Sequence, residues 1–203
     1  MSAYPLMLDG ASLSAVVVGG GAVAARKIAG LAETGAEVHV VAPHVDDSIA
    51  QLAATNPRVR VTRAAYDPEH LGDATLVVAA TDDSAVNTRV AREARRAGRL
   101  VNVADAPKLG NCTTAAVHRS GDLVIAVSAG GVPRAAARIR DALGHRFGAR
   151  YASAIRELVM LRSRLLENGR RDRWSDAARA LFTDDFCDQV ESEQLVARMA
   201  EWR

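Results

Sequence analysis

Residues 15–27 read AVVVGGGAVAARK: apolar residues that favour a buried strand, then glycines, then a helix-forming segment. The spacing is G-x-G-x-x-A, with Gly19, Gly21 and Ala24 at the fixed positions. In this pattern the first glycine permits a tight turn, the second lets the backbone approach a diphosphate, and the alanine lets helix and strand pack closely. The helix N-terminus adds unpaired N–H groups and a positive dipole. Because a strand and a helix flank the glycines, the stretch predicts a dinucleotide site; a glycine-rich turn without nucleotide is the alternative.

Short apolar segments alternate with helical segments as far as residue 103. Such alternation is typical of a parallel sheet covered on both faces, so the predicted fold class is α/β, a Rossmann-like doubly wound parallel sheet. Gly35 and Gly98 stand where helix C-terminal glycines are expected, and Asp83 or Ser84 can cap the third helix. The pattern predicts strands at 15–18, 37–41, 58–62, 75–80 and 100–103, and helices at 22–34, 46–55 and 84–97.

The alternation stops near residue 112. Two apolar segments, 113–118 and 123–128, are separated by Arg119-Ser120-Gly121-Asp122. That turn is too short for a crossover helix and therefore predicts an antiparallel hairpin. Helical segments follow the hairpin, with a break at Asn168-Gly169 and short helices near 175–182 and 184–200.

This organisation predicts an NAD-binding Rossmann domain at 1–112, a dimerisation region at 113–150 and a helical C-terminal region at 151–203. A two-stranded hairpin alone is only marginally stable in water. Burial against a second copy of the chain is the simplest remedy. The sequence therefore predicts a homodimer formed through residues 113–166.

The composition is that of an ordinary globular protein, with 203 residues, 49% hydrophobic content and a formal net charge of +2. No uncharged apolar stretch is long enough to span a membrane. Cys112 and Cys187 lie far apart without a C-x-x-C spacing, which predicts reduced thiols in a cytoplasmic protein. The histidines lack the spacing of a zinc site, so no metal site is predicted.

Asp105 is the main candidate for chemistry. Ligands of open parallel sheets bind beyond the carboxyl ends of the strands, and Asp105 follows the fifth strand, in a loop fixed by Pro107. A carboxylate there could take or give a proton while a hydride moves to a nicotinamide. A turn-stabilising aspartate is the alternative, and the residues alone do not decide between them. The other residues expected at this edge are Gly19–Gly21, Ala42-Pro43-His44, Thr81-Asp82-Asp83 and Ala104–Lys108.

The second strand ends in Val41-Ala42-Pro43 and lacks the acidic residue that usually binds the ribose hydroxyls. Asp46 and Asp47 come later and are expected to cap the next helix. No arginine follows the strand directly either, so a pocket for a 2′-phosphate is not evident. NAD is therefore preferred to NADP as the cofactor.

Arginine is concentrated in residues 134–173. Such an excess is typical of a solvated helix face, and it also suits a polycarboxylate or phosphate ligand, because the guanidinium group binds both. Nucleic acid is disfavoured, since aromatic residues make up only 4% of the chain and the tail after Thr183 is acidic. His118, at the predicted hairpin turn, and His145 are interpreted as surface residues. The arginines are Arg134, Arg138, Arg140, Arg146, Arg150, Arg156, Arg162, Arg164, Arg170, Arg171 and Arg173.

Taken together, the motifs resemble those of the precorrin-2 dehydrogenase / sirohydrochlorin ferrochelatase family, which also forms the N-terminal module of siroheme synthase. The resemblance covers about residues 4–145 and is weaker over the C-terminal helices. The glycine motif occurs in many nucleotide-binding proteins, whereas the complete set in this order is much more specific. The matching residues are Pro5-Leu6, Val18–Lys27, Ala79–Asp83 with Val86-Asn87, Asn102–Lys108 and Ala126–Gly131.

The resemblance implies NAD-dependent oxidation of precorrin-2 to sirohydrochlorin, on the route to siroheme, and leaves open whether the protein also inserts Fe²⁺. It implies a polycarboxylate tetrapyrrole substrate, for which the arginines would have a purpose. The aspartate proposed to act in this family maps to Asp105. Cofactor contacts are expected at Gly19, Gly21, Ala22, Val23, Pro43, His44 and Thr81, and substrate contacts at Asn111, Ser128, Gly130, Arg134 and Arg138.

Two places depart from the family pattern. Gly131-Val132-Pro133-Arg134 stands where a serine-proline step is common, and Asn111-Cys112 where an asparagine and a larger apolar residue are common. Both border the expected tetrapyrrole pocket. The alternatives to an enzyme are an NAD-sensing regulatory module without catalysis and a structural dimer, which would leave the glycine motif unexplained.

Overall fold

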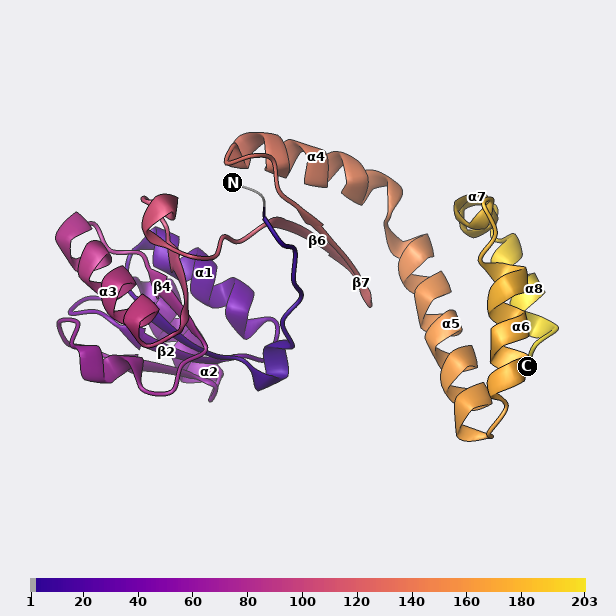
Figure 1. Ribbon diagram of the computed structural model, residues 1–203, viewed down its shortest axis with the longest axis horizontal. Helices are drawn as coiled ribbons and strands as arrows, with labels where there is room; N and C mark the ends of the chain where they lie inside the picture. Colours follow the sequence, from indigo (N-terminus) through magenta and orange to yellow (C-terminus); the bar gives the residue numbers. More distant parts are fainter. Residues whose placement is uncertain (1–2) are drawn as a thin grey trace. The chain divides into compact units, whose positions relative to one another are not determined.

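The computed structural model describes residues 3–203, which divide into two compact units after Thr114 (Figure 1). The first unit holds a five-stranded parallel sheet with the order β3-β2-β1-β4-β5. The order reverses between β1 and β4, which places the switch point of the sheet at the carboxyl end of β1. The predicted fold class is confirmed. The strands are β1 (Ser14–Val18), β2 (Glu37–Val41), β3 (Val59–Thr62), β4 (Leu76–Ala79) and β5 (Leu100–Val103).

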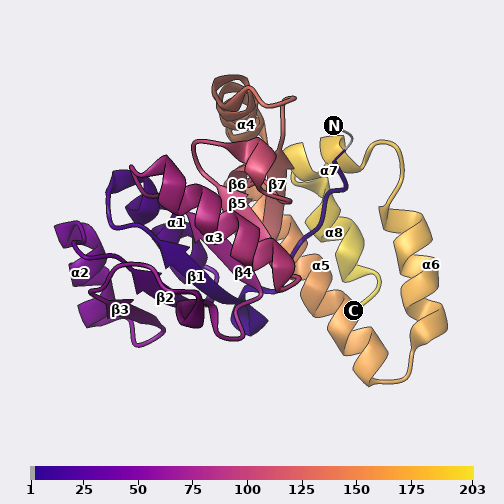
Figure 2. The same cartoon turned by 60° about the vertical axis from the view of Figure 1, so that its left-hand side comes forward.

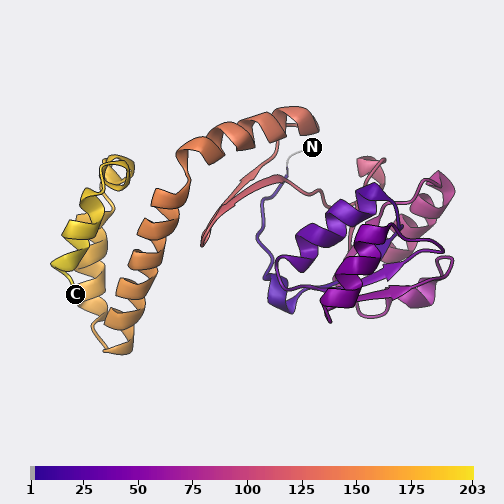
Figure 3. The same cartoon turned by 180° about the vertical axis from the view of Figure 1, so that it is seen from behind.

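The strands β1, β2, β4 and β5 are almost completely buried, which explains why apolar residues predominate in them, whereas β3 at one end of the strand order is only partly buried. Helices α1 (Ala22–Ala32) and α2 (Asp47–Thr55) pack on one face, and α3 (Ser84–Arg96) packs on the other (Figures 1 and 3). Gly35 and Gly98 follow α1 and α3 with φ of 79° and 71°, as helix C-terminal glycines do.

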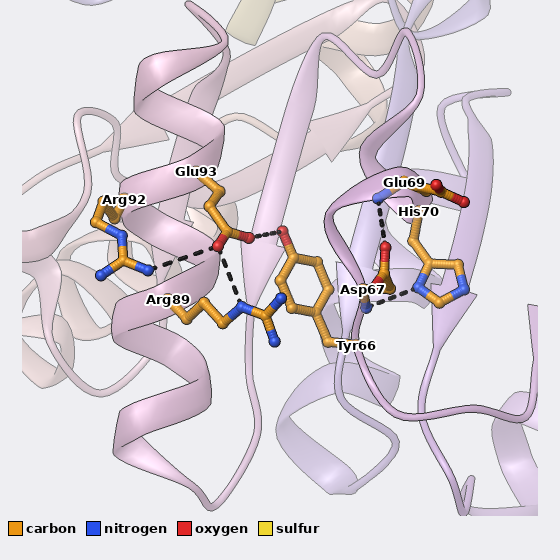
Figure 4. A network of polar contacts seen from close by, with 7 residues as sticks. All are labelled: Tyr66, Asp67, Glu69, His70, Arg89, Arg92 and Glu93. Carbon is orange, nitrogen blue, oxygen red and sulfur yellow. Dashed lines mark hydrogen bonds and ion pairs between the residues drawn. The ribbon is translucent and has the colours of Figure 1, made fainter.

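The connection from β3 to β4 contains no α-helix, only the 3₁₀ turn η2 (Pro68–Leu71). Tyr66 anchors this connection to α3, because its hydroxyl donates a hydrogen bond of 3.0 Å to Glu93 (Figure 4). Arg89 donates to the same carboxylate at 3.1 Å, and burial together with Glu93 raises the pKa of Tyr66. The tyrosine therefore stays a neutral donor and ties this connection, which has no α-helix, to α3.

A capping box shapes the turn at η2 in the same network (Figure 4). Asp67 accepts a bond of 2.9 Å from the Glu69 N–H, and the Asp67 N–H donates to His70 Nδ1 at 3.0 Å. Both bonds satisfy main-chain donors that a short helical turn would otherwise leave unpaired.

The second unit contains an antiparallel hairpin, β6 (Ala116–Ser120) and β7 (Leu123–Val127). The predicted first strand, 113–118, is shifted, because the turn uses two residues and not four, with Gly121 at φ 58°. His118 consequently lies inside β6 opposite Ile125, and not at the turn. Its Nε2 donates to the Phe147 carbonyl at 2.9 Å, so its side chain packs on the adjacent helical segment.

Helices follow the hairpin to the end of the chain, as predicted, with different bounds. The last four pack around a core that includes Leu158, Leu165, Leu181 and Leu195 (Figure 2). The segment predicted as one helix at 184–200 is broken, because Glu193 adopts the left-handed conformation at φ 62°. The helices are α4 (Pro133–Arg146), α5 (Ala149–Glu167), α6 (Arg171–Leu181), α7 (Phe186–Glu191) and α8 (Gln194–Ala200). Among residues 3–203, no helix has the length and apolarity needed to cross a membrane.

His39, in the middle of β2, is a buried histidine that makes folding sensitive to acid. It is 7% exposed, its Nε2 lies 2.8 Å from Thr62 Oγ1, and its Nδ1 has no partner. Burial, followed by the charges of Arg60 and His70, lowers its pKa from 6.5 to about 4. The unfolded chain therefore binds a proton between these two pH values that the folded protein excludes.

The free energy of unfolding is accordingly expected to decrease as the pH is lowered from 6.5 to about 4. His39 alone should account for a loss of roughly 1–3 kcal/mol. Chemical denaturation at pH 7.0 and 4.5 measures the loss. The variant His39→Gln keeps a polar side chain and cannot titrate, so it should lose less stability over the same interval. Equal losses in the two proteins would contradict the assignment to His39.

Candidate dinucleotide site

The loop after β1 is shaped by two glycines packed against main chain. Gly19 has φ 130°, and a Cβ there would overlap the Ala80 carbonyl oxygen. Gly20 lies under the loop after β2, where a Cβ would overlap the His44 carbonyl oxygen; its own carbonyl accepts from the Asp46 N–H at 2.7 Å. The ends of β1, β2 and β4 therefore interlock through backbone alone. The G-x-G-x-x-A pattern does not specify Gly20, so its role was missed in the sequence.

Gly21 is different, because a Cβ at this position would meet no atom within 4 Å. The helix α1 begins directly after it and has no side-chain cap, whereas Asp46 caps α2 and Asp83 caps α3. Among the α-helices of the first unit, α1 thus combines free space with uncapped N–H groups and a positive dipole end. These features fit a diphosphate, which a capping carboxylate would repel.

The other predicted cofactor residues lie at the same end of the sheet, after the carboxyl ends of its strands. Ala22 and Val23 form the exposed first turn of α1. Pro43 and His44 follow β2 and are exposed, and Thr81 follows β4 and is half-buried. Because the strands are parallel, these residues lie beyond the carboxyl ends of the strands, where the chain leaves β1 and β4 toward opposite faces of the sheet.

Asp105 also lies at this end of the sheet, two residues beyond β5, and its side chain is exposed. Pro107 begins the turn η3 (Pro107–Leu109), after which the chain runs back along β5. The main-chain N–H groups of Asn111 and Cys112 both donate to the Val101 carbonyl, at 3.0 and 3.2 Å. The loop that carries Asp105 is therefore closed at both ends on the same strand.

Asn111 closes that loop with its side chain. Its Oδ1 accepts from the Val101 N–H at 2.7 Å, and its Nδ2 donates to the Arg99 carbonyl at 3.0 Å. Both ends of the amide are bonded to the main chain of β5 and the residue before it. These bonds give Asn111 a structural role, and the substrate contact predicted for it stays a prediction.

Asn87 joins the Asp105 loop to the loop after β4. It is 1% exposed, on α3, and its Nδ2 donates to Asp105 Oδ1 at 3.1 Å and to the Thr81 carbonyl at 3.0 Å. Its Oδ1 accepts from the Thr81 N–H at 3.1 Å. No role for Asn87 was predicted from the sequence. Its only signal was its place among the motifs of the family resemblance.

Lys27, the last residue of the glycine stretch, links α1 to the end of the first unit. Its Nζ donates to Thr114 Oγ1 at 2.5 Å. Burial lowers the pKa of Lys27, and the neighbouring Arg26 lowers it further. Cys112 lies nearby, and burial raises the pKa of its thiol; both Cys112 and Cys187 are free.

The predicted substrate residues of the second unit lie around the start of α4. Ser128 and Gly130 are exposed in the connection from β7 to α4, where Gly130 has φ 55°. Arg134 and Arg138 are exposed on α4, and their spacing of four residues puts them on one face of the helix. The N-terminus of α4 has no side-chain cap. This end of α4 thus presents positive charge that suits carboxylates.

Part of the arginine excess is used inside the second unit. Arg146 pairs with Glu191 at 2.7 Å and Arg140 with Asp141 at 2.6 Å. Within residues 3–203, no three His, Cys, Asp or Glu side chains form a group that could hold a metal ion.

Comparison with known proteins adds to this geometry. Residues 6–116 match a family model described as "Putative NAD(P)-binding". This chain belongs to that family. The first unit is therefore an NAD(P)-binding domain, in agreement with the uncapped α1 and the open space at Gly21.

Relatives and a solved structure define the family further. The siroheme synthase of Methylobacillus flagellatus is 33% identical over 99% of this chain and 42% of its own length, and that of Nitrosospira multiformis is 43% identical over 64% and 28%. This chain thus spans less than half of these relatives. A solved structure of SirC, a precorrin-2 dehydrogenase, is 29% identical with a TM-score of 0.78, covering 98% of this chain and 100% of that one. The resemblance to the precorrin-2 dehydrogenase family is confirmed.

Proposed function

We propose that this protein oxidises precorrin-2 to sirohydrochlorin with NAD⁺, in the biosynthesis of siroheme. The observation that carries the proposal is the fold of a precorrin-2 dehydrogenase over nearly the whole chain. The local geometry agrees with it, because an open diphosphate cradle and an exposed carboxylate lie at one edge of one sheet.

Separate residues of this chain would bind the cofactor, transfer the proton and bind the substrate. Bound NAD⁺ supplies a hydride acceptor. The Gly19–Val23 loop would bind its diphosphate through main-chain N–H groups at the start of α1. Asp105 would take up the proton that leaves the macrocycle as conjugation is extended, or hold its pyrrole N–H groups. Arg134 and Arg138 would bind carboxylates of the substrate.

NAD is proposed in preference to NADP. The loop after β2 offers Pro43 and His44, and neither is an arginine that would pair with a 2′-phosphate. Asp46 is engaged as the cap of α2, where it accepts from the Ser48 N–H at 2.9 Å. Calorimetric titration with each cofactor tests this preference.

Anaerobic incubation of the protein with precorrin-2 and NAD⁺ tests the function itself. Oxidation is expected to produce NADH and the sirohydrochlorin spectrum together. NAD⁺ binding by calorimetry without any spectral change would favour the alternative, an NAD-sensing module. Adding Fe²⁺ to sirohydrochlorin then tests metal insertion, a second activity for which Asp105 is the proposed base.

A homodimer is proposed through residues 113–166. Val117 on β6 and Ile139 on α4 are large apolar side chains, 38% and 48% exposed, in a unit whose hairpin has only two strands. Light scattering at micromolar concentration should give twice the chain mass of 21.5 kDa. A mass equal to one chain would contradict the dimer.

A further inference from the structure

Asn87 has the least exposed polar side chain in the described part of the chain, and its amide is bonded on both sides. Its Oδ1 accepts from the main-chain N–H of Thr81, which follows β4. Its Nδ2 donates both to the Thr81 carbonyl and to the carboxylate of Asp105, which follows β5. One buried amide therefore connects a predicted cofactor contact with the predicted catalytic carboxylate.

The bonds to Thr81 fix which way the amide points. The Thr81 N–H can only donate, so it must face Asn87 Oδ1, and the Thr81 carbonyl can only accept, so it must face Nδ2. The Nδ2 group is a donor without acceptor capacity. Asp105 Oδ1, at 3.1 Å from Nδ2, must therefore be an acceptor in this arrangement.

We propose that Asn87 is a positioning residue that keeps Asp105 Oδ1 as a hydrogen-bond acceptor and leaves Oδ2 as the oxygen that exchanges the proton. A proton on Oδ1 would turn that oxygen into a hydroxyl, a weaker acceptor for the Nδ2 hydrogen, whereas a proton on Oδ2 leaves the charge-assisted acceptor at Oδ1 in place. The inference rests on the proposed function, in which Asp105 transfers a proton. The same amide also keeps the carboxylate in register with the Thr81 loop.

A double-mutant cycle measures this role. Asn87→Ser removes the side-chain amide that donates to Asp105, and at saturating precorrin-2 and NAD⁺ we expect kcat to fall about tenfold, because the carboxylate is no longer held in one orientation. In the Asp105→Ala background the same change should alter kcat by less than about twofold, since a residue that acts through Asp105 has nothing left to position. An equal factor in both backgrounds would overturn the proposal.

Gln189→Ser is the matched control for the loss of a buried amide. Gln189 lies on α7 in the second unit, is 3% exposed, and its Nε2 donates to Asp185 Oδ1 at 2.7 Å. Whatever its effect on folding and turnover, the factor should be the same with and without Asp105. Non-additivity would then be specific to Asn87.

A second measurement does not depend on turnover or on a stable Asn87 variant. In nitrogen–proton correlation spectra, the side-chain amide signals of Asn87 should shift in Asp105→Ala and stay unchanged in Asp73→Ala, an exposed carboxylate that precedes β4. Unshifted signals in Asp105→Ala would refute the contact and the proposal. If the wild-type protein does not oxidise precorrin-2, the proposed function fails, and this spectrum still decides whether Asn87 holds the carboxylate.

Discussion

Replacing Asp105 by alanine is expected to lower kcat for precorrin-2 oxidation by about 10²–10⁴, the usual contribution of a positioned general acid or base. The carboxylate is exposed at the end of β5, in a loop that is closed on that strand by main-chain bonds to Val101. Its removal would take away the proposed proton acceptor and leave the Gly19–Val23 loop, proposed to bind the diphosphate, intact. The dissociation constant of NAD⁺ should therefore change by less than about twofold, far below the loss in kcat.

Asp73→Ala is the matched control for this experiment. Asp73 is also an exposed aspartate. It forms an ion pair of 3.7 Å with Arg99 at the other end of the sheet, before the amino ends of β4 and β5. Its removal should leave kcat unchanged. Turnover at the wild-type rate in Asp105→Ala would end the catalytic assignment, and a parallel loss in both variants would point to a general effect of charge.

Gly20→Ala is expected to abolish NAD⁺ binding and to destabilise the fold by roughly 1–3 kcal/mol, as overpacking does. A Cβ at this position would overlap the His44 carbonyl oxygen, which belongs to rigid main chain and cannot turn aside as a side chain would. The loops after β1 and β2 would have to separate. Gly21→Ala should instead leave stability unchanged, because its Cβ meets no protein atom within 4 Å.

Gly21→Ala should still weaken NAD⁺ binding by at least about tenfold, or about 1.4 kcal/mol, because the new methyl group enters the space expected for the diphosphate. Gly30→Ala, in α1 with free space around it, is the control and should stabilise the helix by about 0.5–1 kcal/mol. Thermal unfolding and calorimetric titration of the three variants separate these effects. Unchanged NAD⁺ affinity in Gly21→Ala would place the diphosphate elsewhere.

The sheet and the loops at the carboxyl ends of its strands could be predicted from the sequence because their signals are local. Valine runs, the glycine spacing and the capping aspartates Asp46 and Asp83 each act within a few residues. The hairpin register was not predicted correctly, since the apolar pattern before Gly121 fits a four-residue turn as well as the two-residue turn that the structure contains. The positive φ of Gly121, 58°, decides the register, and the spacing of apolar residues gives no information about this backbone angle.

Contacts between residues far apart in the chain could not be predicted from the sequence. Gly20 matters because the His44 carbonyl lies above it, and Asn87 matters because the loop after β5 brings Asp105 to it. Tyr66 reaches Glu93 across 27 positions to anchor a connection that has no α-helix. An asparagine early in a helix is typical of a surface position, whereas Asn87 is buried and bonded to the loops after β4 and β5.

The backbone interlock at Gly19 and Gly20 has a consequence for the kinetics of cofactor capture. The backbone itself holds the proposed phosphate-binding loop in shape, so an arriving nucleotide would meet a preorganised surface and lose little affinity to the ordering of a loop. Association should then proceed in a single fast phase without a slow conformational step. Differences in affinity among cofactor analogues should appear mainly as differences in dissociation rate.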